Sequence, residues 1–300
     1  KAIVSVDGGL VELQLCTFLD NYVGVHFKPF VTNHAAYIKG TTFQCTGNAN
    51  MLPPYAGQRS YAGIVIDSVE SITIGVPNNI NNLNTFDNLD YGIKSTASNL
   101  TVYNNYFKDL ALSSMPFLPP GYGIYSENQT ATAKSLVVGT SATGTYNDNY
   151  FWNCHAGVYV VKNQNLSISD NNYMQTGYAA VYFESCLANT ISIQYDSIAQ
   201  GLYGIYGRYL RRYSNTNILH NTISNSGTGI SIENDILAKA PLSILFNNII
   251  TPGYIGIKTT NISNSADVSY NDVQFNLSNA NMNNPHFGIL VQNSPQTRLY

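Results

Sequence analysis

Ten copies of a two-part motif recur along the chain, and this repetition constrains the fold more than any other feature. One part is a glycine, in one copy an alanine, followed by Ile or Val. These residues are Gly24, Gly63, Gly92, Gly123, Gly157, Ala180, Gly204, Gly229, Gly256 and Gly288. The other part, apolar-x-x-Asn-x-apolar, precedes each of them. Its polar position is held by Cys16, Cys45, Asn84, Asn105, Asn149, Asn171, Asp196, Asn221, Asn247 and Asn271. Two anchors in a fixed order predict one structural unit stacked on itself.

The period and the local pattern of the copies indicate strands. From Asn149 onward, successive polar positions lie 22 to 26 residues apart, whereas a propeller blade needs about 40. Apolar and polar residues alternate within a copy, as in Leu166-Ser-Ile168, which is the period of a strand. We therefore predict an all-β fold, a single-stranded right-handed parallel β-helix (solenoid) of about ten rungs. Residues 1–300 are expected to form one domain, an excerpt of a longer chain that continues at both ends.

The composition suits such a fold. Only 10% of the residues are charged and 38 are Asn, against about 25% charged residues in an ordinary domain. Equivalent side chains of neighbouring rungs stack about 4.8 Å apart, so neutral amides can pass hydrogen bonds along a ladder where like charges would repel. We expect the polar anchors from Asn84 to Asn271, Asp196 included, to form that structural ladder. The anchor glycines are expected at tight corners with positive φ.

The composition also excludes several classes of protein. Asn and Gly are poor helix formers, which argues against a helical bundle. A net charge of −3 and a pI of about 5.9 argue against a nucleic-acid partner. No apolar run reaches the ~18 residues of a membrane span, so no insertion into a membrane is expected.

Three phrases carry a resemblance to a known family. They are Cys16-Thr-Phe18 with Asn21-Tyr-Val-Gly24-Val-His-Phe27, Tyr122-Gly-Ile-Tyr-Ser126, and Asn149-Tyr-Phe-Trp-Asn-Cys154-His-Ala-Gly157-Val. They resemble the β-helix segments of very large secreted Bacteroidota proteins, which typically end in a type IX secretion sorting domain. The resemblance covers almost the whole chain and implies a secreted or cell-surface location. Similar rung patterns occur in pectate-lyase-like enzymes and phage tailspikes, and most members of the family lack an assigned activity.

Four tyrosines are the candidate ligand-binding residues. They stand two residues after an anchor glycine or alanine in successive copies, where alternation points them outward: Tyr125, Tyr159, Tyr182 and Tyr206. An exposed ladder of aromatic faces with hydroxyl tips suits stacking against sugar rings, which would make a glycan the partner. The alternative is that these rings stack on one another, or lie beneath a loop, as ordinary pairs between rungs.

Glu184, Arg208 and Glu233 fall two residues further along three successive copies and are candidate catalytic residues. Carboxylates two rungs apart would lie roughly 9–10 Å apart, near the separation in inverting glycosidases. Arg208 between them could hold a uronate carboxylate, and Tyr206 could act as the base of a lyase. The alternative is an alternating ion-pair ladder on a solvated face. The chain also lacks the clustered Asp residues of calcium-dependent lyases and polygalacturonase-like helices, so catalysis is uncertain.

Insertions, cysteines and histidines complete the inventory. Loop insertions are expected in the N-terminal half and near the C-terminus, at about 46–61, 108–121 and 274–286, with a further one at 127–145. They would carry an apolar patch of Met51, Leu52, Met115, Phe117 and Leu118. Cys16 and Cys45 share an anchor position and are either bridged or stacked as thiols. The five histidines show no ligand spacing, so neither a metal nor a cofactor is predicted.

The leading functional hypothesis is a non-enzymatic stalk or adhesin-like binding module of a larger secreted or surface protein, with glycans or other surface proteins as partners. The first alternative is a polysaccharide lyase or glycoside hydrolase that works on an outward face. The second is a passive passenger or spacer in a surface or secretion assembly.

Overall fold

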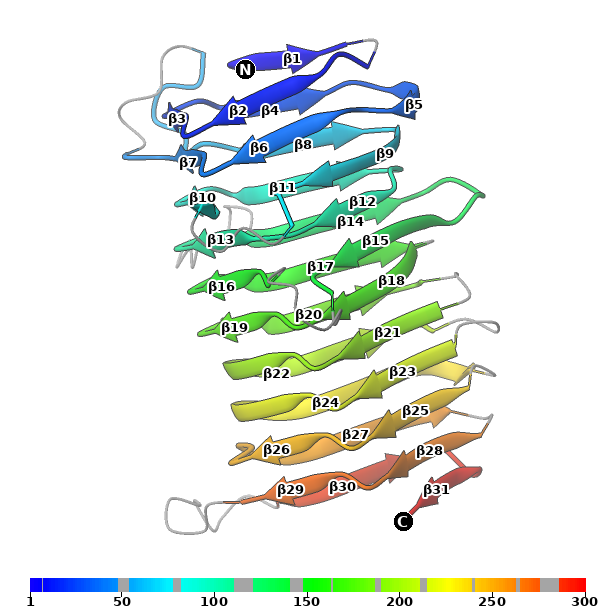
Figure 1. Ribbon diagram of the computed structural model, residues 1–300. Helices are drawn as coiled ribbons and strands as arrows, with labels where there is room; N and C mark the ends of the chain where they lie inside the picture. The colour runs from blue at the N-terminus through cyan, green and yellow to red at the C-terminus, as the bar shows by residue number, and fades with distance from the viewer. Residues whose placement is uncertain are drawn as a thin grey trace.

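The computed structural model describes residues 1–300 except 7, 48–53, 78–81, 111–120, 141–147, 163, 187–189, 211–214, 239–240, 263–264 and 276–285. The described chain is a right-handed parallel β-helix in which each rung contributes a strand to each of three faces (Figure 1). Every strand pairing is parallel and joins one rung to the next. The fold predicted from the repeats is therefore confirmed. No described helix is long and apolar enough to cross a membrane.

The first face carries the Asn anchors. Its members are β3 (Thr17–Leu19), β7 (Thr42–Gln44), β10 (Asn84–Asp87), β13 (Asn105–Lys108), β16 (Tyr150–Trp152), β19 (Asn172–Met174), the first parts of β22 (Ser197–Arg208) and β24 (Thr222–Ala238), β26 (Asn248–Ile250) and β29 (Asp272–Gln274).

The second face carries the Gly anchors. Its members are β1 (Ile3–Ser5), β4 (Val23–Phe27), β8 (Ala62–Asp67), β11 (Tyr91–Thr96), β14 (Tyr122–Asn128), β17 (Ala156–Lys162), β20 (Ala179–Glu184), the later parts of β22 and β24, β27 (Ile255–Ile262) and β30 (Phe287–Gln292).

The third face closes the tube. Its members are β5 (Phe30–Asn33), β9 (Val69–Ile74), β12 (Leu100–Val102), β15 (Lys134–Val138), β18 (Gln164–Ser169), β21 (Thr190–Gln194), β23 (Asn215–Leu219), β25 (Leu242–Leu245), β28 (Ala266–Ser269) and β31 (Thr297–Leu299). A separate pair, β2 (Val11–Gln14) with β6 (Ala36–Lys39), completes the strands near the N-terminus.

The interior of the tube is a column of stacked rings followed by a column of aliphatic side chains. Neighbouring ring centroids lie 4.6–5.0 Å apart with planes 6–13° from parallel. The stacked residues are Phe18, Phe43, Phe86, Phe107, Phe151 and Tyr173. Ile198, Ile223 and Ile249 continue the column, each at most 1% exposed. Such stacking buries large apolar area in each rung, which is the main stabilisation of a fold with so few charges.

The anchor glycines do not serve the purpose expected of them. None has a positive φ, and the left-handed corners belong to other residues such as Asp170 (φ 55°) and Tyr195 (φ 59°). A Cβ on Gly123 would instead lie 2.6 Å from the carbonyl oxygen of Gly157 and 2.6 Å from the ring of Phe151. Crowding by the next rung and by the interior ring therefore explains why glycine recurs here.

The register of the second rung corrects the sequence alignment. Phe18 pairs with Phe43 and Thr17 with Thr42, so Thr41 rather than Cys45 stands at the anchor position beside Cys16. The predicted equivalence of the two cysteines is therefore wrong, because this rung has no Asn to mark its register. Both cysteines are free thiols.

The corners before the C-terminal anchors form a second stack of rings. Tyr195, His220, Phe246 and Tyr270 all have φ near 55–59°. Their centroids are 5.0–5.1 Å apart and their planes lie within 7° of parallel. A left-handed conformation costs a residue other than glycine roughly 1 kcal/mol, and the stacking of neighbouring rings offsets that cost.

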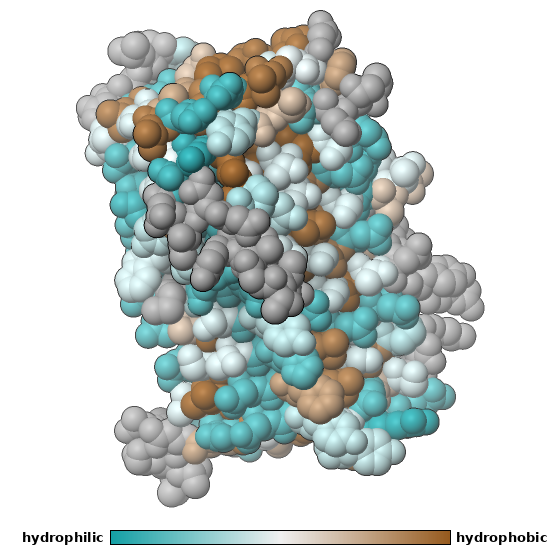
Figure 2. Space-filling model, in the orientation of Figure 1, coloured by the Kyte–Doolittle hydropathy of each residue, from teal (hydrophilic) through white to brown (hydrophobic). Residues whose placement is uncertain are grey.

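Apolar side chains are exposed at the N-terminal end of the tube, at the top of the view in Figure 2. Leu10 and Leu15 are 64% and 74% exposed there. Elsewhere the visible face is a mixture of polar and apolar residues. The largest predicted insertions fall mainly on residues outside the described part of the chain, as do Met51, Leu52, Met115, Phe117 and Leu118.

Candidate functional site

The Asn anchors form a ladder of amide hydrogen bonds along one corner of the tube, in two runs on either side of Asp196. From Asn84, each amide Nδ2 donates to the Oδ1 of the next anchor at 3.0 Å through Asn105 and Asn149 to Asn171. The same contact joins Asn221 to Asn247 (3.0 Å) and Asn247 to Asn271 (2.9 Å). Backbone amides of the anchors donate to the same oxygens. The ladder satisfies the polar groups of the corner in the dry interior, which is a structural task.

Asp196 interrupts this ladder. Its Oδ1 accepts hydrogen bonds from the backbone N and the side chain of Asn171 at 2.9 and 3.1 Å. Its backbone N donates to Asn221 Oδ1 at 3.0 Å, while its own Oδ2 is buried without a partner among the described residues. Burial raises the pKa of this carboxyl to about 7, against the two opposing hydrogen bonds from Asn171. A buried titratable group therefore stands where the other rungs carry an amide.

The four candidate tyrosines lie in register on the second face, on β14, β17, β20 and β22. Their rings use one another as partners. Tyr159 stacks on Tyr182 at 4.2 Å and on Tyr125 at 5.7 Å, with planes within 16°. Tyr206 meets Tyr182 edge-on at 5.5 Å. The spacing between rungs is close to the distance between two stacked rings. The ring faces that were predicted to bind sugars are therefore covered by neighbouring rings.

Of the two readings of this column, the structure agrees with the one in which the rings stack on one another. Tyr182 and Tyr206 are only 2% and 8% exposed. A second aromatic column, which the sequence analysis missed, packs beside them. Its members on the second face are Tyr91, Tyr122, His155, Tyr178 and Tyr203. The signal was present in the sequence, because each of these rings stands one or two residues before an anchor Gly or Ala.

The pKa values of the candidate tyrosines do not suit a catalytic base. Burial, followed by the nearby Glu233 carboxylate, raises the pKa of the Tyr206 phenol well above its usual value of 10. Burial and the hydrogen bond to Glu184 act in the same direction on Tyr182. A lyase needs a phenol that ionises near the working pH. Tyr206 is therefore poorly suited to the role of base.

Glu184, Arg208 and Glu233 lie side by side in register, as the repeat predicted. The ion-pair ladder is not formed among these described residues, because each of the three is engaged by another neighbour. Glu184 accepts from Tyr182, and the Arg208 guanidinium lies over the Tyr209 ring at 4.1 Å. Glu233 pairs with Lys258 at 2.9 Å and accepts from Ser231 at 2.7 Å. No ion pair among the described residues joins Arg208 to either glutamate.

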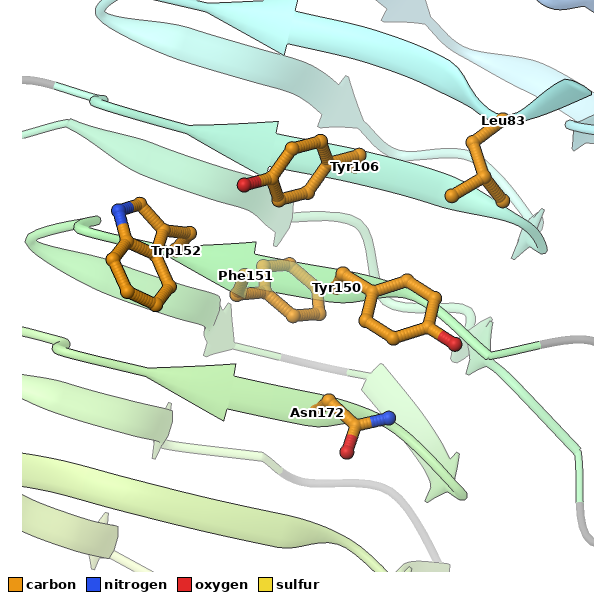
Figure 3. Close-up of a pocket in the computed structure, with 6 residues that line it drawn as sticks. All are labelled: Leu83, Tyr106, Tyr150, Phe151, Trp152 and Asn172. Atoms are coloured by element: carbon orange, nitrogen blue, oxygen red, sulfur yellow. The ribbon is translucent and has the colours of Figure 1, made fainter. Parts of the chain in front are cut away.

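A pocket of about 360 Å³ lies on the first face, where no site was predicted (Figure 3). Its described lining is Leu83, Tyr106, Tyr150, Phe151, Trp152 and Asn172. Tyr106 comes from β13, whereas Tyr150 and Trp152 point outward from β16 on either side of the inward Phe151. Trp152 is the one tryptophan of the chain and is 38% exposed. The repeat already placed Tyr106 and Tyr150 one residue after the anchors of successive copies, Asn105 and Asn149, but it did not single these residues out as a site.

Comparison with protein families matches residues 120–299, or 180 of the 300 residues, to the family described as periplasmic copper-binding protein (NosD). The matched segment begins at β14 and contains every later rung. Searches of curated proteins and of solved structures found no significant match.

The described residues do not gather a copper-ligand set. Copper is bound in proteins by imidazole, thiolate and thioether groups held close together, and no cluster of three or more His, Cys, Asp or Glu occurs in the described ranges. His26 Nε2 lies 2.6 Å from Asp67 Oδ2, with no further such ligand beside the pair. His155 and His220 are stacked on tyrosines. Cys154 is fully buried, and burial raises the pKa of its thiol strongly.

Proposed function

Because the chain belongs to the NosD family of parallel β-helix proteins, we propose that it is a non-enzymatic module that works outside the cytoplasm, in the periplasm or at the cell surface. Its rigid tube would carry a binding face for carbohydrate. The observation that supports this best is the state of the candidate catalytic groups on β20, β22 and β24. Glu184 is engaged by Tyr182, Arg208 by Tyr209 and Glu233 by Lys258.

Binding to glycans separates this proposal from a passive spacer. The test is an array of neutral and acidic polysaccharides probed with the intact chain, followed by calorimetry on the hits. We expect saturable binding to at least one carbohydrate. A chain that binds none of them would leave the spacer as the better reading.

The enzymatic alternative rests on the register of Glu184 and Glu233, two rungs apart on one face. Turnover of the same polysaccharides, followed by reducing ends and by absorbance of unsaturated products, tests it. We expect no turnover above the background of the Glu184→Gln/Glu233→Gln double variant. Turnover that the double variant abolishes would show that the chain is an enzyme.

The family is described as copper-binding, and we do not transfer this property to the chain. The argument is the scattered placement of the described His and Cys side chains. Titration with Cu(II) and Cu(I), followed by mass spectrometry under native conditions, is expected to show no stoichiometric complex. A 1:1 complex that survives dialysis would contradict this.

Display on the cell surface by a type IX route is the finer proposal, which the resemblance to secreted Bacteroidota proteins supports. Fractionation of cells that express the native gene tests it. Protein found in the outer membrane or medium would support surface display. Protein confined to the periplasm would support only the coarser location.

A further inference from the structure

The rings of the first-face pocket differ from the aromatic columns of the second face and of the corners. The tyrosines of the second face and the corner rings are stacked on neighbours. Tyr106, Tyr150 and Trp152 have no ring contact with any described residue. The faces that a stacking ligand needs are therefore open at this place, and Figure 3 shows the three rings spread around one hollow.

The polar groups of the pocket are also uncommitted. The phenol hydroxyls of Tyr125 and Tyr182 are hydrogen-bonded to Glu127 and Glu184. In contrast, none of the pocket's polar side chains (two phenols, one indole, one amide) forms a hydrogen bond to a described residue. Open aromatic faces with a few free donors and acceptors are the combination that binds a ligand with an apolar face and a hydroxyl edge.

The charges around the pocket indicate that this ligand is neutral. Lys108, in register with Trp152, is already paired with Asp87 at 2.9 Å. On the Tyr150 side, Asp148 raises the pKa of the Tyr150 phenol and of the Asp170 carboxyl, in each case after the larger effect of burial. Carboxylates on this side disfavour uronates and sulfated sugars, and Lys108, the described cation in register with Trp152, is already held by Asp87.

We propose that the pocket formed by Tyr106, Tyr150, Trp152 and Asn172 binds neutral pyranose rings of a carbohydrate chain. The apolar face of a sugar ring stacks on Trp152 or a tyrosine, and its hydroxyls bond to the phenols and the Asn172 amide. A volume of about 360 Å³ is at the small end of the range for ligand pockets, which suits a short stretch of a polymer. This inference rests on the proposed carbohydrate-binding function and names its site and ligand class.

The single tryptophan allows a site-specific test. The intact chain is titrated with neutral oligosaccharides (cello-, xylo-, manno- and malto-series), with oligogalacturonate and with choline, while acrylamide quenching of Trp152 fluorescence and heat are recorded in parallel. We expect one neutral series to give saturable heat, with protection of Trp152 from quenching over the same concentrations. Oligogalacturonate and choline are expected to give neither signal.

Substitutions of the pocket residues test whether they contact the sugar. Tyr106→Ala and Tyr150→Ala should each weaken binding by about tenfold or more, as expected for a stacked anchor residue. Trp152→Leu, which keeps an apolar side chain but removes the ring, should do the same by calorimetry, and Trp152→Phe should retain part of the affinity. Tyr254→Ala is the matched control, because Tyr254 is 50% exposed outside the pocket. Its affinity should be unchanged, and thermal unfolding should be alike in all five variants.

The outcomes separate this inference from the proposed function. Carbohydrate binding that leaves Trp152 quenching and the pocket variants unaffected would overturn the pocket while keeping the module a carbohydrate binder. Tighter binding of oligogalacturonate would overturn the neutral ligand. Protection by choline alone would replace the sugar with a quaternary ammonium group, which aromatic sites also bind. No binding of any carbohydrate would overturn the proposed function itself.

Discussion

Asp196 shows how much one atom matters in a stacked repeat. An amide at this position would donate one hydrogen bond onward to Asn221 Oδ1 and accept another from Asn171, as the other anchors do. A carboxylate can only accept, so its Oδ2 is left facing groups that also accept. Burial favours the neutral acid in the folded chain, and protonation also restores a donor to the ladder.

Asp196→Asn should stabilise the protein above neutral pH. The folded-state pKa is about 7, against 3.8 for the ordinary group, so the folded chain retains a proton that the unfolded chain has lost. The free energy of unfolding of the wild type should therefore fall as pH rises from about 4 to about 7, by on the order of 4 kcal/mol, and then level off. The variant lacks this loss, and its melting temperature should be several degrees higher at pH 8.

The pH dependence is the decisive control for Asp196→Asn. At pH 4 both side chains are neutral, so the two proteins should melt at nearly the same temperature. Asn171→Asp, which moves a carboxyl next to Asp196, should be destabilised at pH 8. A gain in Asp196→Asn that is equal at pH 4 and pH 8 would contradict the explanation.

Tyr173→Phe is expected to raise the free energy of unfolding by about 1 kcal/mol. Tyr173 is fully buried at the end of the interior ring stack, 4.6 Å from Phe151, and its hydroxyl has no described partner. Removing an unsatisfied buried hydroxyl while keeping the ring removes a desolvation cost. Denaturant unfolding measures the change. The reverse substitution one rung earlier, Phe151→Tyr, should destabilise, and a loss of stability in Tyr173→Phe would show that the hydroxyl has a partner.

At the scale of a strand, the recurring glycine is a spacing device. Gly123→Ala should lower the free energy of unfolding by about 2 kcal/mol or more, because its Cβ would lie 2.6 Å from a backbone oxygen of the next rung. Gly288 holds the same motif position but has nothing within 4 Å of its Cβ. Gly288→Ala should therefore be neutral or gain up to about 1 kcal/mol. Equal losses in the two variants, by chemical unfolding, would refute crowding as the cause.

The strands and their order followed from the sequence wherever both anchors were present. Asn84 to Asn271 align in the structure as the motif aligned them, because an interior amide and an interior apolar residue two places on mark both the corner and the inward direction. The second rung was misaligned by four residues because Thr41 stands in place of the amide. The role of the glycines was also misjudged, since crowding between rungs cannot be read from a single strand.

At the scale of the molecule, stability should vary along the tube. A rung contacts only its neighbours, and the strands at the two ends of the described tube are more exposed than those in its middle. We expect backbone amides of β16 to β24 to exchange with solvent far more slowly than those of β1 and β31, whose side chains are more exposed. Hydrogen exchange followed by mass spectrometry measures this gradient. Uniform protection along the chain would indicate a single cooperative unit instead.

The candidate site was the least predictable part. The four tyrosines of the second face were visible as a column in the sequence. The rings that pack beside them stand one residue before the anchor Gly or Ala in some copies and two residues before it in others, so their column was not apparent. The pocket brings together Tyr106 and Tyr150, which are 44 residues apart with an insertion between them. A ring face is exposed only where the neighbouring rung supplies no stacking partner. Predicting that exposure requires knowledge of which residues of each rung lie in register.

The parallel register has one more consequence. Because every rung is joined to the next through equivalent backbone pairings, a whole rung of 22 to 26 residues could be gained or lost with local effects only. Each such event would lengthen or shorten the tube by about 4.8 Å and leave the hollow around Trp152 unchanged. The length of the tube can therefore change in steps of one rung while the residues that line the pocket stay the same.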